Sequence, residues 1–248
     1  MDPNTFSTRI FIASHFGLGD NILCNGIYRY FAKKYELCVL PVRKSNLVAV
    51  QRMLSDVSNI IITPYNDFFA DDIILFHKKL LKYLGFDVLN LGHSDNDFKL
   101  NMKRESIRFD EAFYKQAGID FGLRWEDSCY PRIMEEEIEL FDELGCKKGE
   151  YQFLHEDPQR NFLINRKYLN PNLKVITPNK LLKNSNFFNY GYVLENAAEI
   201  HCIESSFAAL IESLDIRVPK YAHRYARPEA ANDFHHEFTY KSTWNIYE

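Results

Sequence analysis

Short apolar runs alternate with helix-like stretches along the first part of the chain. Between the runs, Leu23, Ile27, Tyr30 and Phe31 recur at helical spacing. The runs are continuously apolar rather than alternating with polar residues, so they predict parallel strands that helices bury on both faces. The predicted strands lie at 9–14, 37–42, 59–63 and 86–91, with a long helix at 71–84.

The same alternation returns near residue 151, after a stretch of different character. Residues 95–150 are rich in charge and show helical spacing at 109–117 and 133–144. The later strands are predicted at 151–155, 173–177 and 199–203, with helices at 192–198 and 205–214.

This pattern predicts an α/β fold of two Rossmann-like halves that face each other. We expect an N-terminal half over residues 1–94, a helical connector over 95–150 and a C-terminal half over 151–248. Each half alone is too small for a full doubly wound sheet, which is why we expect the two halves to work together.

Composition narrows the function classes. The 248 residues are 46% hydrophobic and carry a net charge of −4, which predicts a folded core and argues against nucleic-acid binding. No run reaches the ~18 apolar residues of a transmembrane segment. The first residues lack the features of a signal peptide. The five cysteines form no C-x-x-C pair, which indicates reduced thiols and a cytoplasmic protein. The oligomeric state stays open.

The first motif, Gly17-Leu18-Gly19-Asp20, joins a predicted strand to a helix. Gly17 and Gly19 would let a ligand approach the backbone closely. Position 22 is Ile22, so the motif is not the G-x-G-x-x-G of dinucleotide-binding proteins. Asp20 is either an acidic residue that caps the helix or a general base, and His15 is a second candidate for the base.

The second motif runs from His155 to Arg160 and follows a predicted strand end. Arg160 suits a phosphate, because its guanidinium can donate to two oxygens at once. The alternative is an ordinary turn, with Asp157 placed before Pro158.

The third motif is Glu204-Ser205-Ser206, where a predicted strand meets a helix. Serine hydroxyls and free amides at such a junction can bind a pyrophosphate, although one serine could simply be the N-cap. His201, within the apolar strand, is interpreted as a core residue.

Two further groups lie near the C-terminus. Arg224 belongs to a basic cluster that either closes a nucleotide site or lies in solvent. His235 and His236 are not expected to bind a metal, because they lack suitably spaced partners. The letters of a D-x-D motif at 95–97 lie in the polar connector, so no metal site is predicted.

Together these residues resemble the heptosyltransferase-like group of GT-B glycosyltransferases. Phe16-Gly17-Leu18-Gly19-Asp20-Asn21-Ile22 is similar to the G-x-G-D start of that group, and the segment 197–207 is similar to its late donor-site segment. The matching stretches cover about half of the chain. The chain departs from the group at Cys24-Asn25-Gly26, where Thr-Pro is usual.

The resemblance implies transfer of a sugar from a nucleotide-sugar to a hydroxyl of a glycan or glycoconjugate. Asp20 would accept the proton, and Ser205, Ser206 and an arginine would stabilise the leaving diphosphate, without a metal or another cofactor. Glu204 or Asp157 would bind the ribose hydroxyls. The alternatives are a nucleotide-sugar epimerase or hydrolase, and a non-catalytic nucleotide-sugar-binding module.

Overall fold

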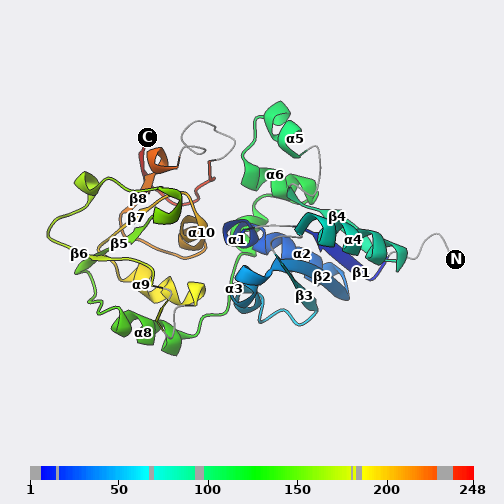
Figure 1. The fold of residues 1–248 in the computed structure, drawn as a ribbon, viewed down its shortest axis with the longest axis horizontal. Helices are drawn as coiled ribbons and strands as arrows, with labels where there is room; N and C mark the ends of the chain where they lie inside the picture. Colours follow the sequence, from blue (N-terminus) through cyan, green and yellow to red (C-terminus); the bar gives the residue numbers. More distant parts are fainter. Residues whose placement is uncertain are drawn as a thin grey trace. The chain divides into compact units, whose positions relative to one another are not determined.

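The computed structural model describes residues 7–14, 17–66, 70–92, 98–179, 181–182, 186–227 and 237–248. The chain divides into two compact units, Met1–Pro131 and Arg132–Glu248 (Figure 1). Each unit contains one parallel sheet with helices, which confirms the predicted α/β class.

The sheet of the first unit has four strands in the order β3-β2-β1-β4. All neighbouring strands are parallel, and Phe11 of β1 is in register with Val39 of β2 and Val88 of β4. In β1 the residues Ile10–Ala13 are apolar and buried, as expected of a strand whose two faces are both covered. The strands are β1 (Arg9–Ala13), β2 (Leu37–Arg43), β3 (Ile60–Tyr65) and β4 (Asp87–Asn90).

Helices join and cover these strands. The longest is α4, whose residues Ile73, Ile74 and Leu81 pack on the β1–β2 core around Phe11. The helices of this unit are α1 (Leu18–Leu23), α2 (Asn25–Lys34), α3 (Leu47–Met53), α4 (Ala70–Tyr83), α5 (Phe98–Glu105), α6 (Phe109–Gln116) and α7 (Leu123–Glu126), with a 3₁₀ turn η1 (Lys44–Asn46).

The predicted connector is divided between the two units. Gly26 of α2 lies so close to α7 that a Cβ there would collide with the Leu123 carbonyl, and Tyr114 of α6 donates to the Leu23 carbonyl at 2.9 Å. Asn25 donates to the Cys129 carbonyl at 2.7 Å. These contacts hold α6 and α7 on the first unit, and the boundary between the two units falls after residue 131, inside the stretch 95–150.

The sheet of the second unit has five parallel strands in the order β6-β5-β7-β8-β9. The strands are β5 (Tyr151–His155), β6 (Lys174–Ile176), β7 (Glu199–Cys202), β8 (Lys220–His223) and β9 (Asn245–Tyr247). The α-helices are α8 (Met134–Glu143), α9 (Gly191–Glu195) and α10 (Ser206–Glu212), and the 3₁₀ turns are η4 (Pro158–Arg160), η5 (Arg166–Tyr168), η6 (Phe187–Tyr190) and η7 (Arg224–Ala226).

The two faces of this sheet are covered differently. On one face Phe153 packs against Tyr190 and against Phe207 of α10. On the other face the segment between β5 and β6 forms only 3₁₀ turns, and Leu154 packs there with Ile164. On that face, aromatic and aliphatic side chains of a loop therefore cover the sheet, where a helix would usually do so.

The sequence reading did not predict β8 and β9. Lys220 is a charged residue within β8, yet it is buried, and its amine donates to the Ile216 carbonyl at 2.7 Å. The strand β9 has only three residues and pairs with a single neighbour, β8, so its pattern is half-exposed. Neither segment has the continuous apolar pattern by which the other strands were predicted.

Candidate functional site

The strand order of the second unit defines where a ligand is expected. From β5 the chain crosses to β6 on one side and then to β7 on the other, so the direction of winding reverses between β5 and β7. Open parallel sheets bind ligands at such a switch point, beyond the carboxyl ends of the strands. The residues that follow β5 and β7 are therefore the first candidates.

His155 and Ser205 meet at this switch point. His155 ends β5 and is paired in register with Cys202, which ends β7. Ser205 follows β7 as the N-cap of α10, its side chain accepting from the Phe207 amide. The Ser205 hydroxyl is hydrogen-bonded to Nδ1 of His155 at 2.9 Å. Two motifs that are 50 residues apart in the sequence thus form one polar group at the carboxyl ends of β5 and β7.

The surroundings hold this pair in place. The His155 ring lies over the Phe207 ring, with 4.6 Å between the ring centroids. The Cys202 thiol lies 3.7 Å from the Ser205 hydroxyl, and burial raises its pKa to about 12. Cys202 therefore stays a neutral thiol, and the hydroxyl and the imidazole are the groups suited to contact a ligand.

Glu204 lies beside this pair but is fully buried. One of its carboxylate oxygens accepts from the Tyr240 hydroxyl at 2.8 Å and from Nε of Arg224 at 3.2 Å. Burial raises the pKa of Glu204. The carboxylate links the end of β7 to the C-terminal segment. The sequence did not predict this contact, because its partners are distant along the chain.

Arg224 is buried and surrounded by carboxylates. It forms ion pairs with Glu204, Glu237 and Glu248 at 3.1 to 3.3 Å. The basic cluster that the sequence shows after the last apolar helix is therefore charge-compensated at this residue.

The segment after β5 folds into a short turn. The Asp157 side chain accepts from the backbone amide and from Nε of Arg160, the latter at 2.7 Å. Burial alone would raise the pKa of Asp157, but the hydrogen bonds from Arg160 outweigh it and lower the pKa. Arg160 itself is exposed. The turn anticipated as the alternative reading is thus present, with an exposed arginine on it.

In the first unit the Gly17–Asp20 loop follows β1. The N-cap of α1 is Gly17, and Asp20 lies in the first turn of that helix, partly buried. The strand order β3-β2-β1-β4 places the switch point between β1 and β4, so Asp20 also lies near a switch point. Burial, followed by the Asp20 charge, raises the pKa of the Cys24 thiol.

A second polar feature of the second unit was not predicted. His201 and His223 are both buried, and Nδ1 of His201 lies 3.0 Å from Nε2 of His223. Burial, followed by the His201 charge, lowers the pKa of His223 to about 3. His201 was expected to be a core residue, and it is. Its partner His223 was hidden because β8 was not recognised as a strand.

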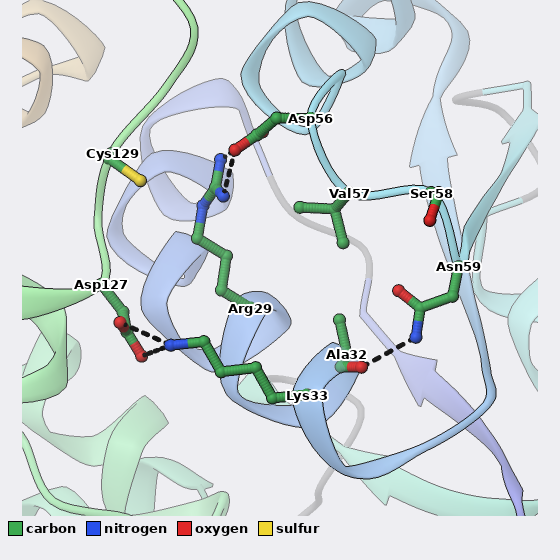
Figure 2. Close-up of a pocket in the computed structure, with 9 residues that line it drawn as sticks. All are labelled: Arg29, Ala32, Lys33, Asp56, Val57, Ser58, Asn59, Asp127 and Cys129. Atoms are coloured by element: carbon green, nitrogen blue, oxygen red, sulfur yellow. Dashed lines mark hydrogen bonds and ion pairs between the residues drawn. The ribbon is translucent and has the colours of Figure 1, made fainter.

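A pocket of about 320 Å³ lies in the first unit, at the end of the sheet opposite the switch point (Figure 2). Its charged groups form pairs, Arg29 with Asp56 at 2.8 Å and Lys33 with Asp127 at 2.8 Å. Cys129 is exposed at its edge. None of the residues that line the pocket belongs to the sequence motifs described above, so the pocket is not part of the candidate site.

Several predictions fall outside the described residues. These are His15, the D-x-D letters at 95–97, and His235 with His236. Among the residues that the structure does describe, no cluster of histidine, cysteine, aspartate or glutamate could hold a metal ion. All five cysteines are free. No helix in the described part of the chain is long and apolar enough to cross a membrane.

The backbone of this chain is similar to the backbones of solved glycosyltransferases. A family 9 glycosyl transferase from Veillonella parvula is 11% identical, with 87% of this chain and 80% of that chain covered at a TM-score of 0.49. The dodecameric, iron-containing glycosyltransferase TibC from enterotoxigenic E. coli is 11% identical, with 97% of this chain and 62% of that chain covered at 0.47.

A third solved structure is the E. coli heptosyltransferase WaaC with ADP-2-deoxy-2-fluoro heptose. It is 12% identical, with 87% of this chain and 88% of that chain covered at a TM-score of 0.42. No protein-family model and no curated protein sequence matches this chain.

Proposed function

We propose that the protein is a glycosyltransferase that moves a sugar from a nucleotide-sugar to a hydroxyl of a glycan or glycoconjugate. The observation that carries the proposal is the His155–Ser205 pair, held at 2.9 Å at the switch point of the second sheet. It joins the motif that begins at His155 to Ser205, which lies in the segment that is similar to the donor-site segment of GT-B glycosyltransferases. The other motif, G-x-G-D, follows the central strand of the first unit.

The second unit would bind the donor through its phosphates. When the glycosidic bond breaks, the nucleoside diphosphate gains negative charge, which oriented donors stabilise. The Ser206 hydroxyl supplies one such donor, and the His155–Ser205 pair supplies another, from the group that accepts within the pair. The exposed Arg160 is a candidate cation. Because these groups neutralise charge without a divalent ion, the proposed transfer is metal-independent.

The first unit would supply the base. An attacking hydroxyl must lose its proton, and Asp20 is a partly buried carboxylate in the first turn of α1. Gly17 and Gly19 carry no side chain that would keep an acceptor from the backbone. In this assignment the two units divide the reaction, one holding the donor phosphates and the other activating the acceptor.

Thermal shift with a panel of nucleoside diphosphates and nucleotide-sugars tests the donor site. A hydrogen bond to a charged group contributes about 1.5–3 kcal/mol, so Ser205→Ala and His155→Ala should each weaken diphosphate binding about tenfold or more. Ser213→Ala is the matched control. Its hydroxyl bonds the Leu210 carbonyl just beyond the opposite end of α10 and should have no effect on binding.

Release of nucleoside diphosphate in the presence of hydroxyl acceptors tests transfer itself. With a donor that binds, release should depend on the acceptor and persist in EDTA. Release without any acceptor would indicate a hydrolase. Binding without turnover would indicate a binding module. Loss of transfer in EDTA, restored by Mg²⁺ or Mn²⁺, would contradict the metal-independent assignment.

A further inference from the structure

The helix α4 is apolar on its outer side as well as on its inner side. Its inner residues pack on the core of the first unit, where Ile74 is buried. On the outside, Phe76 is 63% exposed, Leu80 40% and Tyr83 88%. Neighbouring exposed apolar side chains mark an interaction surface, so the outer side of α4 calls for a partner.

The exposed apolar residues form a continuous row. Phe76, Leu80 and Tyr83 stand at i, i+4 and i+7, a spacing that places side chains on one face of a helix. Leu84 follows at i+8 and is 50% exposed. We call these four residues the α4 stripe. Figure 1 shows α4 together with the β1 and β4 strands that it contacts.

Basic residues lie beside the stripe. Lys79 and Lys82 are exposed on α4, and Lys78 is partly exposed. Arg9 is exposed at the end of the helix, where it donates to the Leu84 carbonyl at 3.1 Å. Among the side chains that the structure describes, the exposed acidic residues of α4 and β4 are Asp72, at the start of the helix, and Asp87, which accepts from the Tyr35 hydroxyl. The helix end that carries the stripe is therefore positive, although the whole chain has a net charge of −4.

We propose that the α4 stripe docks on an anionic lipid surface. Phenylalanine, leucine and tyrosine side chains beside lysines are the combination with which helices lie in a membrane interface, the apolar side chains entering the acyl boundary and the lysines facing lipid phosphates. The positive charge beside the stripe complements such a surface. This inference is independent of the reaction proposed above, since α4 contributes no residue to either candidate site.

Vesicle co-sedimentation of the full chain tests the proposal. The probes are vesicles of phosphatidylcholine alone and of phosphatidylcholine mixed with phosphatidylglycerol. The wild type should bind the mixed vesicles at low salt and the neutral vesicles far less. The double variant Phe76→Ser/Tyr83→Ser should bind the mixed vesicles at least about tenfold more weakly, because it lacks the two aromatic side chains that would enter the acyl boundary.

A second variant tests the charge without touching the apolar row. Each lysine near an anionic surface contributes about fivefold in partitioning, so Lys79→Gln/Lys82→Gln should lose about 25-fold at low salt and little at high salt. The matched control is Val48→Ser/Leu100→Ser, which removes two other exposed apolar side chains of the same unit, 68% and 67% exposed. The control should stay within about twofold of the wild type.

The proposal fails if the wild type does not bind the mixed vesicles at low salt, or if both variants bind like the wild type. It also fails if the chain forms a dimer in the absence of lipid and Phe76→Ser/Tyr83→Ser abolishes it, because the stripe then belongs to a second copy. Circular dichroism of each variant checks that these exposed substitutions leave the fold intact.

Discussion

The two units share a parallel α/β plan but differ in where they bury polar groups. In the first unit the buried charges lie between helices, as in the ion pair of Asp110 with Arg124. In the second unit, Glu204 and His223 are buried at and beyond the strand ends, and Glu137 and Glu212 are buried on helices. The strand plan follows from burying an apolar sheet on both faces, and this plan does not dictate which polar groups each unit carries.

The loops that follow the central strands show the same difference. In the first unit the start of α1 carries Gly17 and Gly19, which have no side chain to cover the backbone, and the partly buried Asp20. In the second unit hydrogen bonds fix the side chains, as between His155 and Ser205. Fixed donors suit a site that binds phosphate, and an accessible backbone suits a site that admits an acceptor.

Replacing the Asp20 carboxylate of the first unit should have the largest effect, and this effect is on turnover. Asp20→Asn keeps the shape of the side chain but cannot accept a proton, so turnover should fall by about 10²–10⁴-fold. The affinity for the donor should stay unchanged, because the donor phosphates are assigned to the other unit. A transfer assay and a donor titration on the same variant measure the two effects.

Asp120→Asn is the control for this prediction, since Asp120 is an exposed loop carboxylate of the same unit. It should leave turnover unchanged. If Asp20→Asn turned over like the wild type, Asp20 would have no catalytic role and the proposed division of labour between the units would lose its base.

Removing the buried Glu212 carboxylate should lower the stability of the second unit and leave that of the first unit unchanged. Glu212 of α10 accepts from the Lys241 and Ser242 amides, from the Ser242 hydroxyl and from Trp244 Nε1. Glu212→Ala leaves these donors without their acceptor, so the free energy of unfolding should fall by about 2–4 kcal/mol. The exposed Glu143→Ala should cost less than about 0.5 kcal/mol.

The two tryptophans can report on the units separately, because Trp125 lies in the first and Trp244 in the second. In a Trp125→Phe background, urea unfolding followed by Trp244 fluorescence should show the full loss caused by Glu212→Ala. In a Trp244→Phe background, the Trp125 signal should be unaffected. Equal losses in both backgrounds would mean that the two units unfold together and would contradict the prediction that Glu212 stabilises the second unit alone.

Mild acid should lower the free energy of unfolding of the second unit, by less than Glu212→Ala does, and leave that of the first unit unchanged. Burial lowers the pKa of His223 from 6.5 to about 3, so between these values the unfolded chain binds a proton that the folded chain does not. Stability is therefore complete above pH 6.5 and falls with pH, by about 1.4 kcal/mol between pH 7.5 and 5.5. In the first unit the pKa of Asp56 is lowered by Arg29, which matters only below its usual 3.8.

Unfolding of the second unit at the two pH values checks this prediction, with His223→Phe as the comparison. This variant keeps an aromatic ring but cannot titrate, so the loss on acidification should shrink. The raised pKa of Glu204 acts in the opposite direction, and it is present in both proteins. A loss of equal size in the variant would show that His223 is not the group responsible.

Much of the fold could be predicted because it depends on neighbouring residues. The spacing of apolar positions located seven of the nine strands in the described part of the chain, and it located α4, α6, α8 and α10 to within a few residues. His155 and Ser205 were identified as candidates for a related reason. The ends of predicted strands are the places where a parallel sheet binds ligands, so position along the chain was enough.

Other features depend on residues that are distant in sequence, and only the tertiary structure decided them. The unit boundary at residue 131 follows from Gly26 packing against α7, and the burial of Glu204 follows from Tyr240 and Arg224 closing over it. The 2.9 Å contact of His155 with Ser205 needs β5 and β7 to be neighbours in the sheet. Periodicity records which side of an element is apolar, but not which element covers it. For that reason the sequence by itself determined the strands and helices, and the packing of the sheets decided which side chains meet and which, like those of the α4 stripe, stay exposed.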